Sequence, residues 1–149
     1  MKISIHFITS LILTAMLWQF ISFHSLWAMV GGYLIDFDHY LYAGIKWKMW
    51  SLKTSYHYLM KKLDRKATKR GEILHIFHTV EFWILMIMMA YISYKNNWTF
   101  LLYMFAITFI GMALHLILDF IHGFITDRIG ERAISFLWWI KKYSKTRHK

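Results

Sequence analysis

Four long apolar segments, separated by short or basic polar stretches, make up most of this chain. They cover residues 3–23, 26–45, 73–94 and 98–125. A helix needs roughly 20 apolar residues to cross a bilayer, and each segment is about that long or longer. The pattern therefore predicts an all-α integral membrane four-helix bundle, with residues 1–149 forming a single membrane domain.

The polar stretches predict how such a bundle is oriented. Residues 24–25 and 95–97 are short turns, whereas residues 46–72 form a long and strongly basic connection. Glu131–Tyr143 is amphipathic and precedes a basic tail, which is typical of a helix lying at the membrane interface. Because Lys and Arg concentrate on the cytoplasmic side, we expect an N-in/C-in topology with a basic cytoplasmic loop. Residues 128–149 then hold a C-terminal interfacial amphipathic helix.

Two local patterns are less regular. Gly31 and Gly32 lie inside the second apolar segment and predict a bend or break there, because glycine weakens a helix interior. In the basic connection, Leu52–Leu63 has apolar residues on one side. A helix on the membrane surface and a solvated loop are equal alternatives for that stretch.

Composition narrows the possible partners. The chain contains no cysteine, which excludes disulfides, thiolate metal sites and cysteine nucleophiles. A net charge of +10 can indicate nucleic-acid binding, but the basic residues here lie between and after the apolar segments. That distribution favours anionic lipid headgroups. We therefore expect membrane lipid as the partner, no nucleic acid, and a multi-pass integral protein of the cytoplasmic membrane.

Three of the apolar segments carry acids and histidines but no lysine or arginine. Segment by segment, these residues are Asp36, Asp38 and His39; His75, His78 and Glu81; and His115, Asp119 and His122. An acid inside a membrane span costs roughly 2.5–3.5 kcal/mol on insertion scales and usually marks a functional site. A bound cation supplies the missing positive charge, and imidazole with carboxylate is an ordinary ligand set. We expect one or two divalent metal ions: zinc, manganese or iron.

The spacing within each set supports this interpretation. Most members are three or four residues apart, so each set lies along one helical face, and all three sets fall about 6–18 Å from the cytoplasmic end of their helix. Faces that meet at one depth predict a shared metal pocket. Any one of these histidines alone would fit a hydrogen bond between helices equally well. Asp36 and Asp38 are two residues apart, so either the helix breaks there or one acid supports the ligands without binding the metal. The remaining histidines are expected to be ordinary polar residues: His6, His24, His57 and His148.

Three short motifs appear in a recognisable order. They are Gly32-Tyr33-Leu34-Ile35-Asp36-Phe37-Asp38-His39, then His75-Ile76-Phe77-His78-Thr79, then His115-Leu116-Ile117-Leu118-Asp119. In these motifs the chain resembles the membrane-bound metal-dependent hydrolases called the LexA-regulated, YdjM-like family. The resemblance implies metal-ligand roles for Asp36, Asp38, His39, His75, His78, His115 and Asp119. The chain departs from that family at Ile35, where proline is usual, and at Ile76, where arginine is usual.

These observations predict a metal-dependent hydrolase at the cytoplasmic membrane face, acting on a lipid or lipid-linked phosphate. The candidate ligands are Asp36, Asp38, His39, His75, His78, His115, Asp119 and His122. Glu81 or Asp38 is the candidate general base, and Thr79 is a candidate for orienting the substrate or a ligand. The basic residues from Arg65 to Arg70 would attract a phosphate headgroup.

Two other functions use the same residue types. Di-iron membrane oxidoreductases of the desaturase or hydroxylase kind hold histidine clusters, and His115-x-x-x-Asp119-x-x-His122 faintly resembles one of their motifs. Such centres usually need more histidines than the five in this core. An ion or proton carrier would use intramembrane Asp, Glu and His as a relay. A relay should reach both faces, and the outer half of this bundle offers few polar groups.

Overall fold

The computed structural model describes residues 3–55, 57–58, 74–125 and 134–144, and within them every regular element is a helix, as expected. The chain forms two compact units. The first unit comprises Met1–Ile35 and Phe82–Arg128, and the second comprises Asp36–Glu81 and Ile129–Lys149. Each unit has its own helices and its own cluster of acids and histidines.

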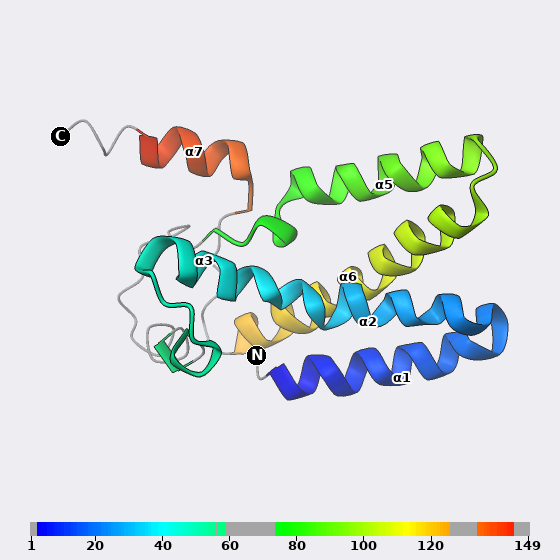
Figure 1. Ribbon diagram of the computed structural model, residues 1–149, viewed down its shortest axis with the longest axis horizontal. Helices are drawn as coiled ribbons and strands as arrows, with labels where there is room; N and C mark the ends of the chain where they lie inside the picture. Colours follow the sequence, from blue (N-terminus) through cyan, green and yellow to red (C-terminus); the bar gives the residue numbers. More distant parts are fainter. Residues whose placement is uncertain (1–2, 56, 59–73, 126–133, 145–149) are drawn as a thin grey trace. The chain divides into compact units, whose positions relative to one another are not determined.

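A helical hairpin begins the first unit. Helix α1 (Ile3–Ile21) leads through the 3-10 turn η1 (Ser22–Leu26) into α2 (Trp27–Gly32), which returns alongside α1 (Figure 1). The chain reverses at Ser22, whose φ of 50° is left-handed and breaks the helical path. The turn expected at residues 24–25 is therefore confirmed within η1.

The second half of the first unit contains the longest single helix described. Helix α5 (Val80–Lys95) enters this unit at Phe82 and is joined to α6 (Thr99–Ile125) by a tight turn. Asn97 has a φ of 57°, a left-handed conformation that asparagine tolerates better than most residues. The turn expected at residues 95–97 and the long fourth helix are both confirmed.

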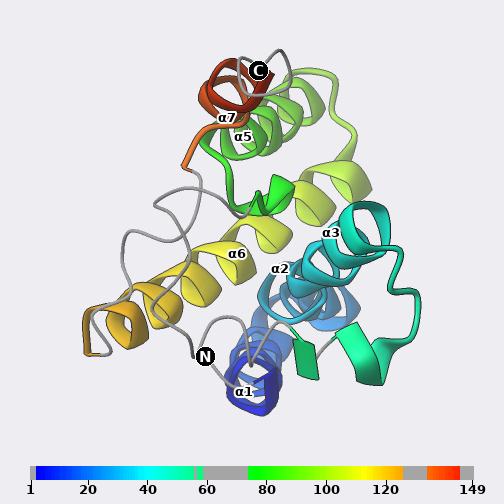
Figure 2. The ribbon, with the colours of Figure 1, turned by 90° about the vertical axis from the view of Figure 1, so that its left-hand side faces the viewer.

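Helices α2 and α6 pack closely through small residues (Figures 1 and 2). A Cβ added at Gly31 would lie 1.9 Å from the carbonyl oxygen of Thr108. A Cβ added at Gly111 would lie 2.4 Å from the carbonyl oxygen of Ala28, which is fully buried. Only residues with little or no side chain let two helix backbones approach this closely. The contact therefore fixes the register between α2 and α6.

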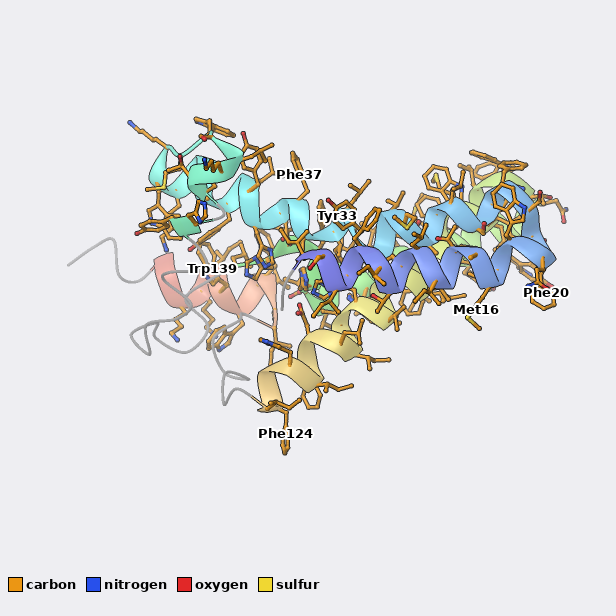
Figure 3. The ribbon with its side chains drawn as sticks, turned by 90° about the horizontal axis from the view of Figure 1, so that it is seen from below. Met16, Phe20, Tyr33, Phe37, Phe124 and Trp139 are labelled. Carbon is orange, nitrogen blue, oxygen red and sulfur yellow. The ribbon has the colours of Figure 1, made fainter. Side chains whose placement is uncertain are left out.

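Within the described residues, two helical stretches are long and apolar enough to cross a membrane: Ile3–Trp47 and Thr99–Ile125. Large apolar side chains point outward from both of them (Figure 3). Met16 and Phe20 on α1 are 62% and 83% exposed, and Phe124 on α6 is 72% exposed. An exposed apolar surface of this kind favours contact with lipid or with another apolar partner.

The second unit begins where the second apolar segment breaks. Helix α2 ends at Gly32, and the 3-10 turn η2 (Leu34–Asp36) leads into α3 (Phe37–Trp47). This agrees with the break predicted from the glycine pair. It also explains how Asp36 and Asp38 can both belong to one polar cluster although they are only two residues apart.

The third expected helix starts later than its sequence pattern indicates. His75 has extended backbone, the 3-10 turn η3 covers Ile76–His78, and α5 begins only at Val80. The Asp38 carboxylate accepts the Phe77 N–H, and the Thr79 hydroxyl donates to the Ile76 carbonyl. These side chains satisfy backbone groups of the turn, so a turn replaces the first helical residues. The expectation that His75, His78 and Glu81 share one helical face is therefore wrong.

Two basic or amphipathic stretches complete the second unit. Helix α7 (Phe136–Ser144) lies largely within the amphipathic segment that was expected to form a helix. In the basic connection, residues 52–55 and 57–58 are helical. The rest of the proposed surface helix, residues 56 and 59–63, lies outside the described residues. The basic residues from Arg65 to Arg70 also lie outside the described residues.

Candidate metal centre

The predicted acids and histidines fall into two clusters, one in each unit. The Asp38 cluster, in the second unit, consists of Asp36, Asp38, His39, His75 and His78. The Asp119 cluster, in the first unit, consists of His6, His115 and Asp119. The expectation of one pocket shared by three segments involves both units and stays a prediction.

The buried carboxylate of Asp38 is surrounded by hydrogen-bond donors. Its Oδ1 lies 2.7 Å from Nδ1 of His39, and its Oδ2 lies 3.2 Å from Nδ1 of His78 and 3.1 Å from the backbone nitrogen of Phe77. An ionised carboxylate only accepts hydrogen bonds, so each Nδ1 carries the proton. The Nε2 atom of each neutral ring then keeps its lone pair, as a metal ligand requires.

Those two Nε2 atoms converge on the neighbouring acid. Nε2 of His39 lies 3.7 Å from Oδ1 of Asp36, and Nε2 of His78 lies 3.9 Å from the same oxygen. Both distances are too long for a hydrogen bond. Ligand atoms around a tetrahedral zinc ion lie about 3.4 Å apart, so a small rotation would close these atoms around a cation. A carboxylate that holds the other nitrogen of a ligating histidine is a common arrangement in metal sites.

His75 adds a deeply buried nitrogen to this cluster. The residue is 2% exposed, and its ring stacks on that of His39 with centroids 3.6 Å apart. Its Nδ1 makes no hydrogen bond within the described part of the chain, although Oδ1 of Asp38 lies 3.5 Å away. Asp38, His39 and His75 also offer ligand atoms within 4.8 Å of one another. The buried His and Asp groups of the second unit are therefore able to hold a metal ion.

The Asp119 cluster has a different construction. His115 and Asp119 lie one turn apart on α6, with Nε2 and Oδ2 separated by 3.3 Å. Nε2 of His6, on α1, lies 3.2 Å from the other carboxylate oxygen, Oδ1. The two imidazole rings stack with centroids 3.8 Å apart and planes 16° apart. On its other side, Nδ1 of His115 lies 2.9 Å from the carbonyl oxygen of Gly32.

His6 is the member of this cluster that sequence reasoning missed. It was expected to be an ordinary polar residue, and the structure places it against Asp119 with 1% exposure. The buried residues of α1 are His6, Ser10 and Thr14, which are four residues apart on an otherwise apolar helix. That spacing was the available signal, because residues four apart share one helical face.

The remaining candidate site residues are Glu81, Thr79 and His122, which are not members of the two clusters. The carboxylate of Glu81 accepts hydrogen bonds from the Ser135 hydroxyl and from the backbone nitrogens of Phe136 and Leu137, at the start of α7. The Thr79 hydroxyl donates to the Ile76 carbonyl at 2.7 Å. His122 is half-buried on α6, three residues beyond Asp119. The catalytic roles of Glu81, Asp38 and Thr79 stay predictions, as does the ligand role of His122.

No protein-family model, curated protein or solved structure matches this chain. The resemblance to the LexA-regulated, YdjM-like hydrolases therefore stays a prediction from three short motifs. The geometry of the two clusters and the apolar character of the helices are what support a function.

Proposed function

We propose that this protein is a membrane-embedded metal-dependent hydrolase that acts at the cytoplasmic face on a lipid or lipid-linked phosphate. The observation that carries the proposal is the Asp38 cluster. It directs two imidazole Nε2 atoms at one carboxylate oxygen of Asp36. Zinc, manganese and iron all accept imidazole and carboxylate ligands, and each is compatible with this set.

The hydrogen bonds of the Asp38 cluster suggest which residues bind the metal and which residue positions those ligands. We assign Oδ1 of Asp36 and Nε2 of His39 and His78 as the metal ligands. Asp38 is then a positioning residue, because it accepts hydrogen bonds from Nδ1 of both histidines and from the backbone. A divalent cation held by these residues would lower the pKa of water to about 7 and so make hydroxide available at neutral pH.

The proposed reaction is hydrolysis of a phosphate ester. The water oxygen forms a bond to phosphorus, the bond from phosphorus to the lipid oxygen breaks, and a proton passes to that leaving oxygen. The products are a phosphate and a lipid alcohol. The contribution of Asp38 is to keep His39 and His78 in place throughout, because its two oxygens already accept their Nδ1 protons.

A membrane location supports the choice of a lipid substrate. We infer that α1, the α2–α3 segment, α5 and α6 are four spans with both chain ends in the cytoplasm, as the distribution of Lys and Arg favours. The exposed side chains of Lys46, Lys48 and Lys53 belong to the same unit as the Asp38 cluster. Lysines near a membrane surface attract anionic phosphate headgroups.

The membrane assignment is tested by extracting cell membranes with alkaline carbonate. A protein with several spans stays in the membrane pellet, whereas a peripheral protein is released. Recovery of most of the chain in the soluble fraction would contradict the four-span proposal.

The activity is tested on purified protein in detergent, stripped of metal and reloaded with zinc or manganese without oxygen. Phosphatidic acid serves as the monoester probe and phosphatidylglycerol as the diester probe, and phosphate and lipid products are measured. We expect metal-dependent product release that Asp36→Ala abolishes. His57→Ala, a change at an exposed histidine of the same unit, is the matched control and should keep the activity.

Two outcomes would overturn the proposal. Absence of product from both probes with metal-loaded protein would argue against phosphate hydrolysis. Lipid oxidation that requires iron and oxygen would support the di-iron oxidoreductase instead.

A further inference from the structure

One face of α3 continues from the Asp38 cluster to the end of the helix. His39, Tyr42 and Lys46 are three and four residues apart, so their side chains follow one another along this face. The Tyr42 ring meets the ring of His75 edge to face, with centroids 6.4 Å apart, and His75 stacks on His39 at 3.6 Å. Tyr42 is therefore connected through one imidazole ring to a histidine that we assign as a metal ligand.

Lys46 turns back along α3 toward that histidine. Its Nζ donates a hydrogen bond to the Tyr42 hydroxyl oxygen at 2.6 Å, one helical turn nearer the start of α3. The same ammonium lies 5.1 Å from the centroid of the Tyr42 ring and 5.8 Å from the centroid of a Trp47 ring. Such cation–π contacts favour an ammonium close to aromatic rings. The exposed lysine therefore has a defined position, on the side of α3 that faces the cluster.

These two polar groups match a phosphate bound beside the Asp38 cluster. An ammonium has three N–H groups, and a tyrosine hydroxyl has a proton of its own, so both are able to donate to phosphate oxygens. A phosphate monoester has three oxygens outside the ester bond and a charge of about −1.5 to −2 at neutral pH. A diester has only two such oxygens and a single charge. The cation, Lys46 and Tyr42 would provide one partner for each oxygen of a monoester.

We propose that Lys46 and Tyr42 bind the substrate phosphate and make the site selective for a phosphate monoester over a diester. This rests on the proposed hydrolase function and specifies its substrate class, a lipid phosphate monoester. Charge favours the same selectivity, because an ammonium attracts a dianion more strongly than a monoanion at the same distance.

The test compares cleavage of phosphatidic acid, a monoester, with cleavage of phosphatidylglycerol, a diester, by zinc-loaded protein in detergent. We expect a higher kcat/KM for phosphatidic acid. Lys46→Met keeps the chain length but removes the charge, and it should lower that kcat/KM about tenfold or more while changing the diester value much less. Tyr42→Phe keeps the ring and should lower it about threefold to tenfold. Lys46→Arg keeps the charge and should retain the preference.

Lys142→Met is the matched control. Lys142 also lies over an aromatic ring of the second unit, 4.6 Å from the centroid of Trp138, but on α7. The control should keep both kcat/KM values. Helical content by circular dichroism shows whether each variant folds, and Tyr42→Phe decides if Lys46→Met does not. An unchanged ratio of the two kcat/KM values in the folded Lys46 and Tyr42 variants, or an equal decrease in Lys142→Met, contradicts the proposal.

A binding measurement separates this proposal from the hydrolase. Butylphosphonate resembles a phosphate monoester but has no ester bond to cleave, and its binding to zinc-loaded protein is measured by calorimetry. Binding that weakens about tenfold in Lys46→Met supports the phosphate site even if neither lipid is cleaved. Conversely, cleavage that Asp36→Ala abolishes, without any preference for the monoester, supports the hydrolase and contradicts the site.

The source of the phosphate monoester is tested with glycerol 3-phosphate, which carries the same group without acyl chains. Much slower cleavage than that of phosphatidic acid supports a lipid substrate. Equally fast cleavage that depends on Lys46 would support the monoester site but contradict a lipid source.

Discussion

The two clusters use the same residue types in opposite ways. In the Asp38 cluster the central carboxylate faces the Nδ1 atoms of His39 and His78, and their Nε2 atoms point to a second acid. In the Asp119 cluster the carboxylate itself faces two Nε2 atoms, and a backbone carbonyl holds the Nδ1 of His115. The two central carboxylates therefore face different ring nitrogens, and only Asp38 has the contacts expected of an acid that orients histidines whose Nε2 atoms face another group.

The clusters also differ in the backbone that carries them. The Asp119 cluster lies on regular helices whose register is fixed by glycine contacts. The Asp38 cluster lies where helices are interrupted, at η2, at the start of α3 and at η3. Disrupting the contact between α2 and α6 should therefore act first on the helices that carry the Asp119 cluster.

The largest expected effect is that of Gly31→Ala. The new Cβ would lie 1.9 Å from the Thr108 carbonyl oxygen, so α2 and α6 must separate. Overpacking of this kind costs roughly 1–3 kcal/mol, and backbone atoms have no easy way to move aside. The thermal midpoint in detergent should therefore fall. Gly123→Ala, on α6, should be tolerated because alanine favours helix. Equal stability of the two variants would contradict the packing account.

Asp36→Ala should have the next largest effect, on the second unit alone. It removes a proposed ligand, so competition with a chelator should show one Co²⁺ equivalent lost or weakened more than about 100-fold, beyond the usual range for an orienting residue. A Co²⁺ affinity equal to that of the unchanged protein would contradict the assignment of Asp36 as a ligand.

Asp38→Asn should weaken the same equivalent less than Asp36→Ala does. The amide keeps one acceptor oxygen, but its NH₂ group faces an N–H donor, so one histidine loses its support. Removing an orienting partner typically lowers metal affinity about 10–100-fold. If chelator competition gave Asp38→Asn a larger loss than Asp36→Ala, the roles of the two acids would have to be exchanged.

Glu81→Gln should leave the bound Co²⁺ unchanged. Its carboxylate accepts from the Ser135 hydroxyl and from two backbone N–H groups at the start of α7. Loss of a helix cap costs about 0.5–2 kcal/mol, so a small decrease in the thermal midpoint is expected. A change in metal content would instead support a role for Glu81 at the metal centre.

Much of the first unit could be predicted from the sequence. The apolar segments, the short turns at 24–25 and 95–97, and the i, i+4 pair of His115 and Asp119 all follow from helical periodicity. His6 was within reach of the same reasoning, through its four-residue spacing to Ser10 and Thr14. The apolar segment 3–23 contains no acid and no other histidine, so His6 has no such partner at helical spacing that would mark it as part of a cluster.

The second unit was less predictable because its geometry depends on contacts distant in sequence. The turn at Ile76–His78 forms around the Asp38 carboxylate, which lies 39 residues before Phe77. Helical spacing therefore identified His75 and His78 as ligand candidates but assigned them the wrong backbone. The proposed roles of Asp36 as a ligand and Asp38 as a positioning residue depend on which ring nitrogens each carboxylate faces. Spacing in the sequence does not predict which nitrogen of a histidine faces an acid.

The most direct test of this account is the number of Co²⁺ ions that the unmodified, metal-stripped protein binds tightly in detergent. The Asp38 cluster, which directs the Nε2 atoms of His39 and His78 at Asp36, predicts at least one tightly bound equivalent per chain, and Asp36→Ala should bind less. A protein that binds no Co²⁺ at stoichiometric concentrations, while retaining its helical content, would contradict the central claim that this cluster is a metal site.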